Sequence, residues 1–179
     1  YGVTLIIGPF NYPFQLVIAP LIGAISAGNT AIIKPSENTK NISILLEEII
    51  NENFEEEYLK VVSPLEGKEA VSYLLEFPFD YIFFTGSVRV GKIIMEKAAK
   101  NLTPITLELG GKSPCIGDRD AELELAAKRI VWGKFLNAGQ TCVAPDYLCV
   151  HKNIKEKLLK LIISEIHKQF GEEIKTSPD

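Results

Sequence analysis

A cysteine in a loop is the first feature of this sequence that could do chemistry. Cys142 ends the segment GQTC at 139–142 and precedes Pro145, so turn-forming residues flank the thiol on both sides. An accessible loop thiol can ionise and attack an electrophilic carbon, whereas Cys115 and Cys149 lie in apolar, strand-like runs and are expected to pack. Because the sequence places no histidine beside Cys142, an inert loop cysteine stays open as the alternative.

Two other polar side chains follow predicted strands directly. Glu108 opens the segment ELGGK at 108–112, at the carboxyl end of a strand, where parallel sheets bind ligands and partial burial can tune a carboxylate as a base. An ion pair with Lys112 is the alternative. Asn11 lies in PFNYP at 9–13, a rigid turn that could aim its amide, although asparagine is also common in turns for backbone reasons.

A glycine-bounded turn could bind an anionic group. The segment GSVRVG at 86–91 follows a predicted strand and opens a helix, and a helix N-terminus favours a pyrophosphate. The spacing is not the G-x-G-x-x-G fingerprint, and a turn that binds nothing would look similar. With Lys92 the segment also resembles a P-loop, but Ile93 stands where that motif needs Ser or Thr.

Composition limits the classes of protein to which the chain can belong. With 179 residues, 46% hydrophobic and 23% charged, it has the length of one domain, or of one domain and part of another. A net charge of -4 without a basic block argues against a nucleic-acid partner. Three cysteines without metal-like spacing indicate reduced thiols, no metal site and a cytoplasmic location. The apolar run 14–27 is shorter than the roughly 18 residues of a membrane segment.

Alternating strand and helix patterns must position these residues. Such alternation predicts a parallel, doubly wound α/β sheet with helices on both faces. We expect strands at 4–7, 31–34, 59–62, 81–84 and 105–107, and helices at 14–27, 42–51, 68–75 and 91–100.

The pattern restarts after Gly110-Gly111, which predicts a first domain at 1–110 and the beginning of a second α/β domain at 111–179. A strand is expected near 114–116 and a helix from Asp120, whose side chain would supply the N-cap. A final helix is expected from the four-residue spacing of Ile154, Leu158, Ile162, Ile166 and Phe170.

Taken together and in order, five motifs resemble the aldehyde dehydrogenase superfamily. They are the segments PFNYP at 9–13, KPSE at 34–37, FTGS at 84–87, ELGGK at 108–112 and GQTC at 139–142. The stretches 102–115 and 139–147 are most similar to the class 3 or fatty-aldehyde branch, which implies medium-chain, long-chain or aromatic aldehydes as substrates. The resemblance implies a Rossmann-like first domain that binds NAD and a catalytic second domain.

The resemblance also implies roles for individual residues. Cys142 would attack the aldehyde carbonyl, and the Asn11 amide and the Cys142 backbone N–H would stabilise the oxyanion. Hydride transfer to the nicotinamide would leave a thioester, and Glu108 would activate the water that hydrolyses it to a carboxylic acid.

The expected cofactor is NAD, with NADP possible. Lys34 and Glu37 would hold the adenosine ribose hydroxyls, and the carboxylate of Glu37 would repel an added ribose phosphate. The turn from Gly86 to Gly91 would cover the pyrophosphate. The rest of the expected cofactor-binding set is Ser87, Pro9 and Phe10.

Two departures from the family pattern qualify these expectations. Phe10 stands where a tryptophan is usual, and another aromatic should preserve the packing. The chain is also less than half as long as a typical member, so we expect a fragment with negligible turnover by itself, taken from a parent that forms a homodimer. Two alternatives stay open: a coenzyme A-acylating reductase, against which Glu108 argues, and a non-catalytic nucleotide-binding module.

Overall fold

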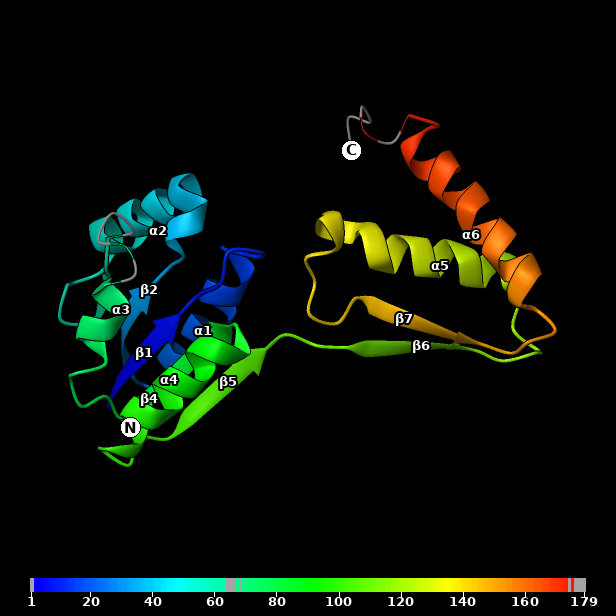
Figure 1. Ribbon diagram of the computed structural model, residues 1–179. Helices are drawn as coiled ribbons and strands as arrows, with labels where there is room; N and C mark the ends of the chain where they lie inside the picture. The colour runs from blue at the N-terminus through cyan, green and yellow to red at the C-terminus, as the bar shows by residue number, and fades with distance from the viewer. Residues whose placement is uncertain (1, 64–66, 68, 174, 176–179) are drawn as a thin grey trace. The chain divides into compact units, whose positions relative to one another are not determined.

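The structure is a computed structural model that describes residues 2–63, 67, 69–173 and 175. It divides into two compact units, Tyr1–Gly110 and Gly111–Asp179 (Figure 1). Each unit has its own sheet and its own helices, and each is described by itself.

The first unit is built on a five-stranded parallel sheet with the order β3-β2-β1-β4-β5. Its central strand β1 pairs Ile6 with Ile33 on one side and with Phe83 on the other. The strands are β1 Val3–Ile7, β2 Thr30–Lys34, β3 Leu59–Val61, β4 Tyr81–Gly86 and β5 Ile105–Leu109. All five expected strands are present, with ends that differ by one or two residues.

Helices cover both faces of this sheet, as the sequence pattern predicts. Alternate residues of β1 point to opposite faces, so Ile6 packs in a cluster with Val17 of α1, whereas Leu5 packs in another with Ile94 of α4. The doubly wound α/β prediction is therefore confirmed. The helices of this unit are α1 Gln15–Ser26, α2 Lys40–Asn53, α3 Glu69–Leu74 and α4 Val88–Ala99. Figure 1 shows these helices around the strands. A short 3-10 turn, η1 Glu37–Thr39, precedes α2.

The second unit has two parallel strands and two long helices. Its core is small, and the buried apolar residues described there are Ala127, Val131, Ala144 and Leu158. The rings of Phe135 and Phe170 also meet, with centroids 5.5 Å apart. The elements are β6 Ser113–Gly117, α5 Leu123–Phe135, the 3-10 turn η3 Leu136–Gly139, β7 Pro145–Val150 and α6 Lys155–Phe170.

The start of α5 differs from the expectation. The helix begins at Leu123, and the side chain of Glu122 accepts hydrogen bonds from the backbone N–H groups of Glu124 and Leu125. Asp120 therefore lies outside the helix and is not its N-cap. The longer glutamate reaches two unpaired N–H groups of the first turn, which stabilises the later start.

The expectation that Cys149 packs in the core is wrong, although its strand is confirmed. Cys149 is exposed, and Cys115 is half-buried. Ile116, the register partner of Cys149, shares its face of the two-stranded sheet and is 77% exposed. An apolar strand residue is buried only where something covers its face, and the described residues leave this face open. Among the helices that the structure describes, none combines the length and apolar character needed to cross a membrane.

Candidate active site

The cysteine loop, residues 140–144, joins η3 to β7 in the second unit. Cys142 is exposed and lies in a tight turn in which the Ala144 N–H donates to the Thr141 carbonyl over 3.1 Å. The preceding residues Asn137, Ala138 and Gly139 have φ values of 53°, 51° and 76°, so the chain enters the loop through a left-handed turn. The thiol is thus accessible on a backbone with a defined path.

Gly111 lies against the backbone of this loop. A Cβ atom at Gly111 would overlap the carbonyl oxygen of Cys142 and lie 3.5 Å from its carbonyl carbon. Any other residue at this position would push the two segments apart. Gly111, the second glycine of ELGGK, is therefore in direct contact with the backbone of Cys142.

Glu108 lies in the first unit, near the end of β5, and its side chain is exposed. It is paired in register with Thr85 of β4, so both side chains point to the same face of the sheet. The Thr85 hydroxyl is buried and has no hydrogen-bond partner among the described residues. Lys112, the partner that the alternative ion pair would use, lies in the second unit and pairs there with Asp146 over 3.3 Å.

Asn11 lies in the turn between β1 and α1. The Gly8 N–H donates to the Lys34 carbonyl over 3.0 Å, which ties the start of this turn to the end of β2. Pro9 is buried below the turn, Phe10 is exposed and Asn11 is half-buried. Asn11 therefore lies on a short, anchored turn at the carboxyl end of the central strand.

Lys34 is a buried charge at the carboxyl end of β2. Only 1% of its side chain is exposed, and its Nζ donates to the Pro35 carbonyl over 2.7 Å and to Glu37 Oε2 over 3.3 Å. Burying an ammonium group is costly unless partners compensate it, and these two bonds use two of its three donors. Among the described residues, these two oxygens are the acceptors recorded for the Lys34 ammonium group.

The turn at 86–91 begins α4. The Ser87 side chain caps the helix by accepting from the Val90 N–H over 3.3 Å. A Cβ at Gly86 would collide with the ring of Phe84, and one at Gly91 would lie 3.0 Å from Leu109. Glycine at these two positions is therefore explained by close packing, and the start of a twelve-residue helix offers N–H groups to an anion.

Residues 1–177 match the sequence model of the aldehyde dehydrogenase family. The chain belongs to this family. Among curated relatives, the 4,4'-diaponeurosporen-aldehyde dehydrogenase of Staphylococcus aureus is 54% identical over all 179 residues, which span 39% of that protein. Aldehyde dehydrogenase family 3 member A2 of Rattus norvegicus is 48% identical over 99% of the chain, which spans 36% of that protein.

Solved structures of aldehyde dehydrogenases are similar to the chain as well. The substrate-bound Staphylococcus aureus AldH has a TM-score of 0.95 and 53% identity, with 100% of this chain and 39% of that chain covered. An NADP-dependent enzyme of E. coli has a TM-score of 0.87 and 31% identity, with 93% and 35% covered. Aldehyde dehydrogenase C of Pseudomonas syringae, in complex with NAD+ and octanal, has a TM-score of 0.84 and 31% identity, with 92% and 34% covered.

In this aldehyde dehydrogenase chain, the first unit brings most of the predicted site residues to one edge of the sheet. Carboxyl ends of parallel strands meet at the same edge, so the segments that follow β1, β2, β4 and β5 gather there. The ends of these strands and the segments after them carry Asn11, Lys34, Glu37, Ser87 and Glu108. Cys142 belongs to the second unit.

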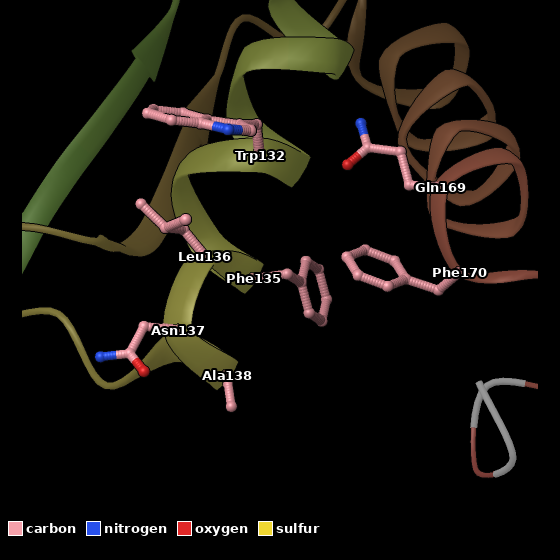
Figure 2. Close-up of a pocket in the computed structure, with 7 residues that line it drawn as sticks. All are labelled: Trp132, Phe135, Leu136, Asn137, Ala138, Gln169 and Phe170. Atoms are coloured by element: carbon pink, nitrogen blue, oxygen red, sulfur yellow. The ribbon is translucent and has the colours of Figure 1, made fainter. Parts of the chain in front are cut away.

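The aldehyde dehydrogenase chain also has an apolar groove between the ends of α5 and α6. Figure 2 shows the Phe135 and Phe170 rings facing each other, with Trp132 one turn earlier on α5. The lining residues are Trp132, Phe135, Leu136, Asn137, Ala138, Gln169 and Phe170. No titratable side chain lines it among the described residues, so the groove offers contact area and no acid or base.

Three features of the site were missed by sequence reasoning. Gly111 was available in the sequence as the second glycine of ELGGK, but its contact with the Cys142 carbonyl was not. The residue type of Thr85 does not show that its hydroxyl is buried. The left-handed backbone at Ala138 has no signal in the sequence either, because alanine seldom adopts positive φ.

Proposed function

We propose that this chain forms the cofactor-binding and nucleophile-bearing part of an NAD(P)-dependent aldehyde dehydrogenase that oxidises an aldehyde to a carboxylic acid. The observation that carries the proposal is the exposed thiol of Cys142 on a constrained loop, in a chain that belongs to this family. The first unit would bind the cofactor. The second would be the beginning of the catalytic domain.

In the proposed reaction, the Cys142 thiolate forms a bond to the aldehyde carbon, and the carbonyl electron pair moves onto oxygen. The Asn11 amide and the Cys142 backbone N–H donate to that oxyanion. A nicotinamide cofactor would supply the hydride acceptor when bound, and loss of the hydride from the same carbon would leave a thioester on Cys142. Glu108, exposed at the end of β5, takes a proton from water, the resulting hydroxide attacks the thioester and the thiolate leaves.

The residues at the sheet edge fit the expected dinucleotide. Glu37 holds Lys34 in place at the end of β2, and the pair would bind the ribose hydroxyls. The partly exposed carboxylate of Glu37 would oppose a ribose phosphate, which favours NAD over NADP. The first turn of α4, with Gly86, Ser87 and Gly91, would face the pyrophosphate, and Pro9 and Phe10 would complete the set.

We propose an apolar aldehyde as the substrate, either of medium or long chain or aromatic. This rests on the similarity to a diaponeurosporen-aldehyde dehydrogenase and to an enzyme crystallised with octanal. Three free cysteines in the described residues support a reducing, cytoplasmic location. A homodimeric assembly is inferred from the family resemblance alone.

The test separates the two chemical steps in a protein of full family length that contains this chain. Glu108→Gln keeps the shape but removes the base, so we expect thioester hydrolysis to slow by about 100- to 10,000-fold while hydride transfer continues. Rapid mixing at saturating aldehyde should then show a burst of one NADH per active site before slow turnover. Cys142→Ser should show no burst.

Matched controls are Glu96→Gln, an exposed glutamate of the same unit, and Cys149→Ser, an exposed thiol of the same unit as Cys142. Both should keep the parent rate. A Glu108→Gln enzyme with an unchanged steady-state rate would remove Glu108 from the mechanism, and loss of the burst would show that it also deprotonates Cys142. Turnover that requires coenzyme A in place of water would favour the acylating reductase.

A further inference from the structure

We propose that Gly111 and the left-handed turn at 137–139 are positioning residues that fix the backbone of Cys142, so that its N–H stays aimed at the carbonyl oxygen of the substrate. This inference rests on the proposed function, because it assigns these residues a part in the same site. All of them lie in the second unit, so the argument needs only contacts within that unit.

The peptide groups on both sides of Cys142 are fixed by different contacts. The group before it contains the Thr141 carbonyl, which accepts from the Ala144 N–H over 3.1 Å. Because a peptide group is planar, this bond also sets the direction of the Cys142 N–H. The group after it contains the Cys142 carbonyl, whose oxygen lies where a side chain of Gly111 would have to be. The backbone torsions φ and ψ of Cys142 are therefore constrained by the peptide groups on both sides.

Gly111 is required for the second of these contacts. Its missing Cβ would overlap the carbonyl oxygen of Cys142, which is backbone and cannot move aside as a flexible side chain can. An added methyl group would have to rotate or shift the peptide that follows Cys142. The resulting shift of the Cys142 N–H is small, but a misplacement of about 1 Å in a group that contacts the substrate can lower the rate about 100-fold.

The turn at 137–139 constrains the entry to the cysteine loop. The Gln140 N–H donates to the Asn137 carbonyl over 3.0 Å, and the Gln140 side-chain amide donates to the same oxygen over 3.2 Å. Ala138 adopts φ 51° without a polar side chain to favour it, a conformation that persists only where its surroundings impose it. Figure 2 shows Asn137 and Ala138 directly after α5, so the turn anchors the loop to that helix.

The first experiment compares two glycine-to-alanine substitutions in the second unit, in a protein of full family length. Gly111→Ala should lower the rate of the NADH burst by about 10- to 100-fold, while the KM for NAD stays close to the parent value. Gly133→Ala is the matched control: its methyl would meet Pro145 at 3.5 Å, an ordinary contact, and the burst should be unchanged.

A thiol-labelling experiment on the 179-residue chain separates failure of the inference from failure of the proposed function. Iodoacetamide labelling followed by peptide mapping should show that Gly111→Ala changes the rate at Cys142 at least about 3-fold while Cys149 reacts as before. If this labelling result is obtained but the unsubstituted protein of full family length produces no aldehyde-dependent NADH, the proposed function is refuted and the positioning contact still stands. Equal Cys142 labelling and equal burst rates in the Gly111→Ala and Gly133→Ala proteins would overturn the inference.

Ala138→Gly tests the turn, because stability and activity should move in opposite directions. Glycine accepts positive φ without steric cost, so the melting temperature should stay level or rise by a few degrees. The loosened turn should lower the burst rate by about 2- to 10-fold without a change in the KM for NAD. A purely structural role predicts that the two quantities fall or rise together, and that outcome would remove the turn from the proposal.

Discussion

The two units of this chain hold their functional residues by different means. In the first, Leu5 and Ile6 of the central strand are fully buried in clusters on opposite faces of the sheet, so the edge that carries Lys34 and Glu108 rests on a thick core. In the second, the sheet has two strands, and Ile116 and Trp132 are 77% and 62% exposed. There the nucleophile is held by local backbone contacts.

The difference separates what makes a domain stable from what makes a site precise. Parallel sheets are ordinarily covered on both faces, and the first unit follows that rule. The second leaves one face of its sheet open among the described residues, yet the path of the chain around Cys142 is defined by Gly111 and by the turn at 137–139. Positioning at short range does not require a large core.

The largest expected effect is on the cores. Ile6→Ala should cost about 2–5 kcal/mol in the free energy of unfolding, because it opens a cavity between the sheet and α1. Val131→Ala in the second unit removes fewer methyl groups beside a sparser core and should cost about 1–2 kcal/mol. Urea unfolding followed by circular dichroism measures the first. Trp132, the only tryptophan, reports on the second by fluorescence. Equal losses in the free energy of unfolding for the two variants would contradict the difference between the two cores.

The next effect concerns the buried charge at the sheet edge. Lys34→Met removes two hydrogen bonds of an ammonium group but keeps the apolar stem, so the Kd for NAD should rise about 10- to 100-fold. The free energy of unfolding should change by no more than about 1 kcal/mol, since burying the charge was itself costly. Titration calorimetry gives the Kd. Lys60→Met, which breaks the exposed pair with Glu56, is the control and should leave the Kd unchanged.

A smaller effect is expected from exposed apolar side chains. Trp132→Lys in the second unit should reduce self-association of the 179-residue chain several-fold, because Trp132 lines the groove with Phe135 and Phe170. Met95→Lys replaces an exposed apolar side chain of α4 in the first unit, which is not among the residues that line this groove, and should change association little. Sedimentation velocity at several concentrations measures both. If Met95→Lys reduces self-association more than Trp132→Lys does, the surface through which the chain self-associates lies on the first unit.

The smallest effect is electrostatic and has one example in each unit. A hydrogen bond and the charge of Lys97 lower the pKa of Glu76, and a hydrogen bond from Gln169 lowers the pKa of Glu165. A lowered pKa stabilises the fold above the ordinary glutamate pKa, and this contribution is lost as the pH falls through the folded pKa. Lys97→Gln and Gln169→Ala should raise the respective pKa values in an NMR titration of the carboxyl carbons. Lys92→Gln should leave the pKa of Glu76 in place.

Much of the first unit could be predicted from sequence because its signals are local. Strands such as Tyr81–Gly86 are short apolar runs bounded by turn residues, and their alternation with helices determines the doubly wound topology. The start of α5 could not be read correctly, because residue type favours Asp120 as the cap and only the geometry shows that the Glu122 side chain reaches the free N–H groups.

Features that depend on distant contacts were not predictable. The exposure of Cys149 depends on what covers its face of the sheet, and the positive φ of Ala138 depends on the loop around it. The assigned roles of Cys142, Glu108 and Asn11 stay predictions until they are tested, since their chemistry depends on partners that the residue types alone do not reveal.

The position of β1 has a consequence for how this chain is made. Of the five strands of this sheet, β1 is synthesised first and lies at the centre, between β2 and β4, and β4 is synthesised more than 40 residues after β2. Until β4 and β5 emerge, a nascent chain that has paired β1 with β2 keeps one side of β1 open, with the apolar residues Leu5 and Ile7 beside it. Synonymous codons that slow translation between residues 34 and 81 should therefore increase aggregation during synthesis, without changing any residue of the finished protein.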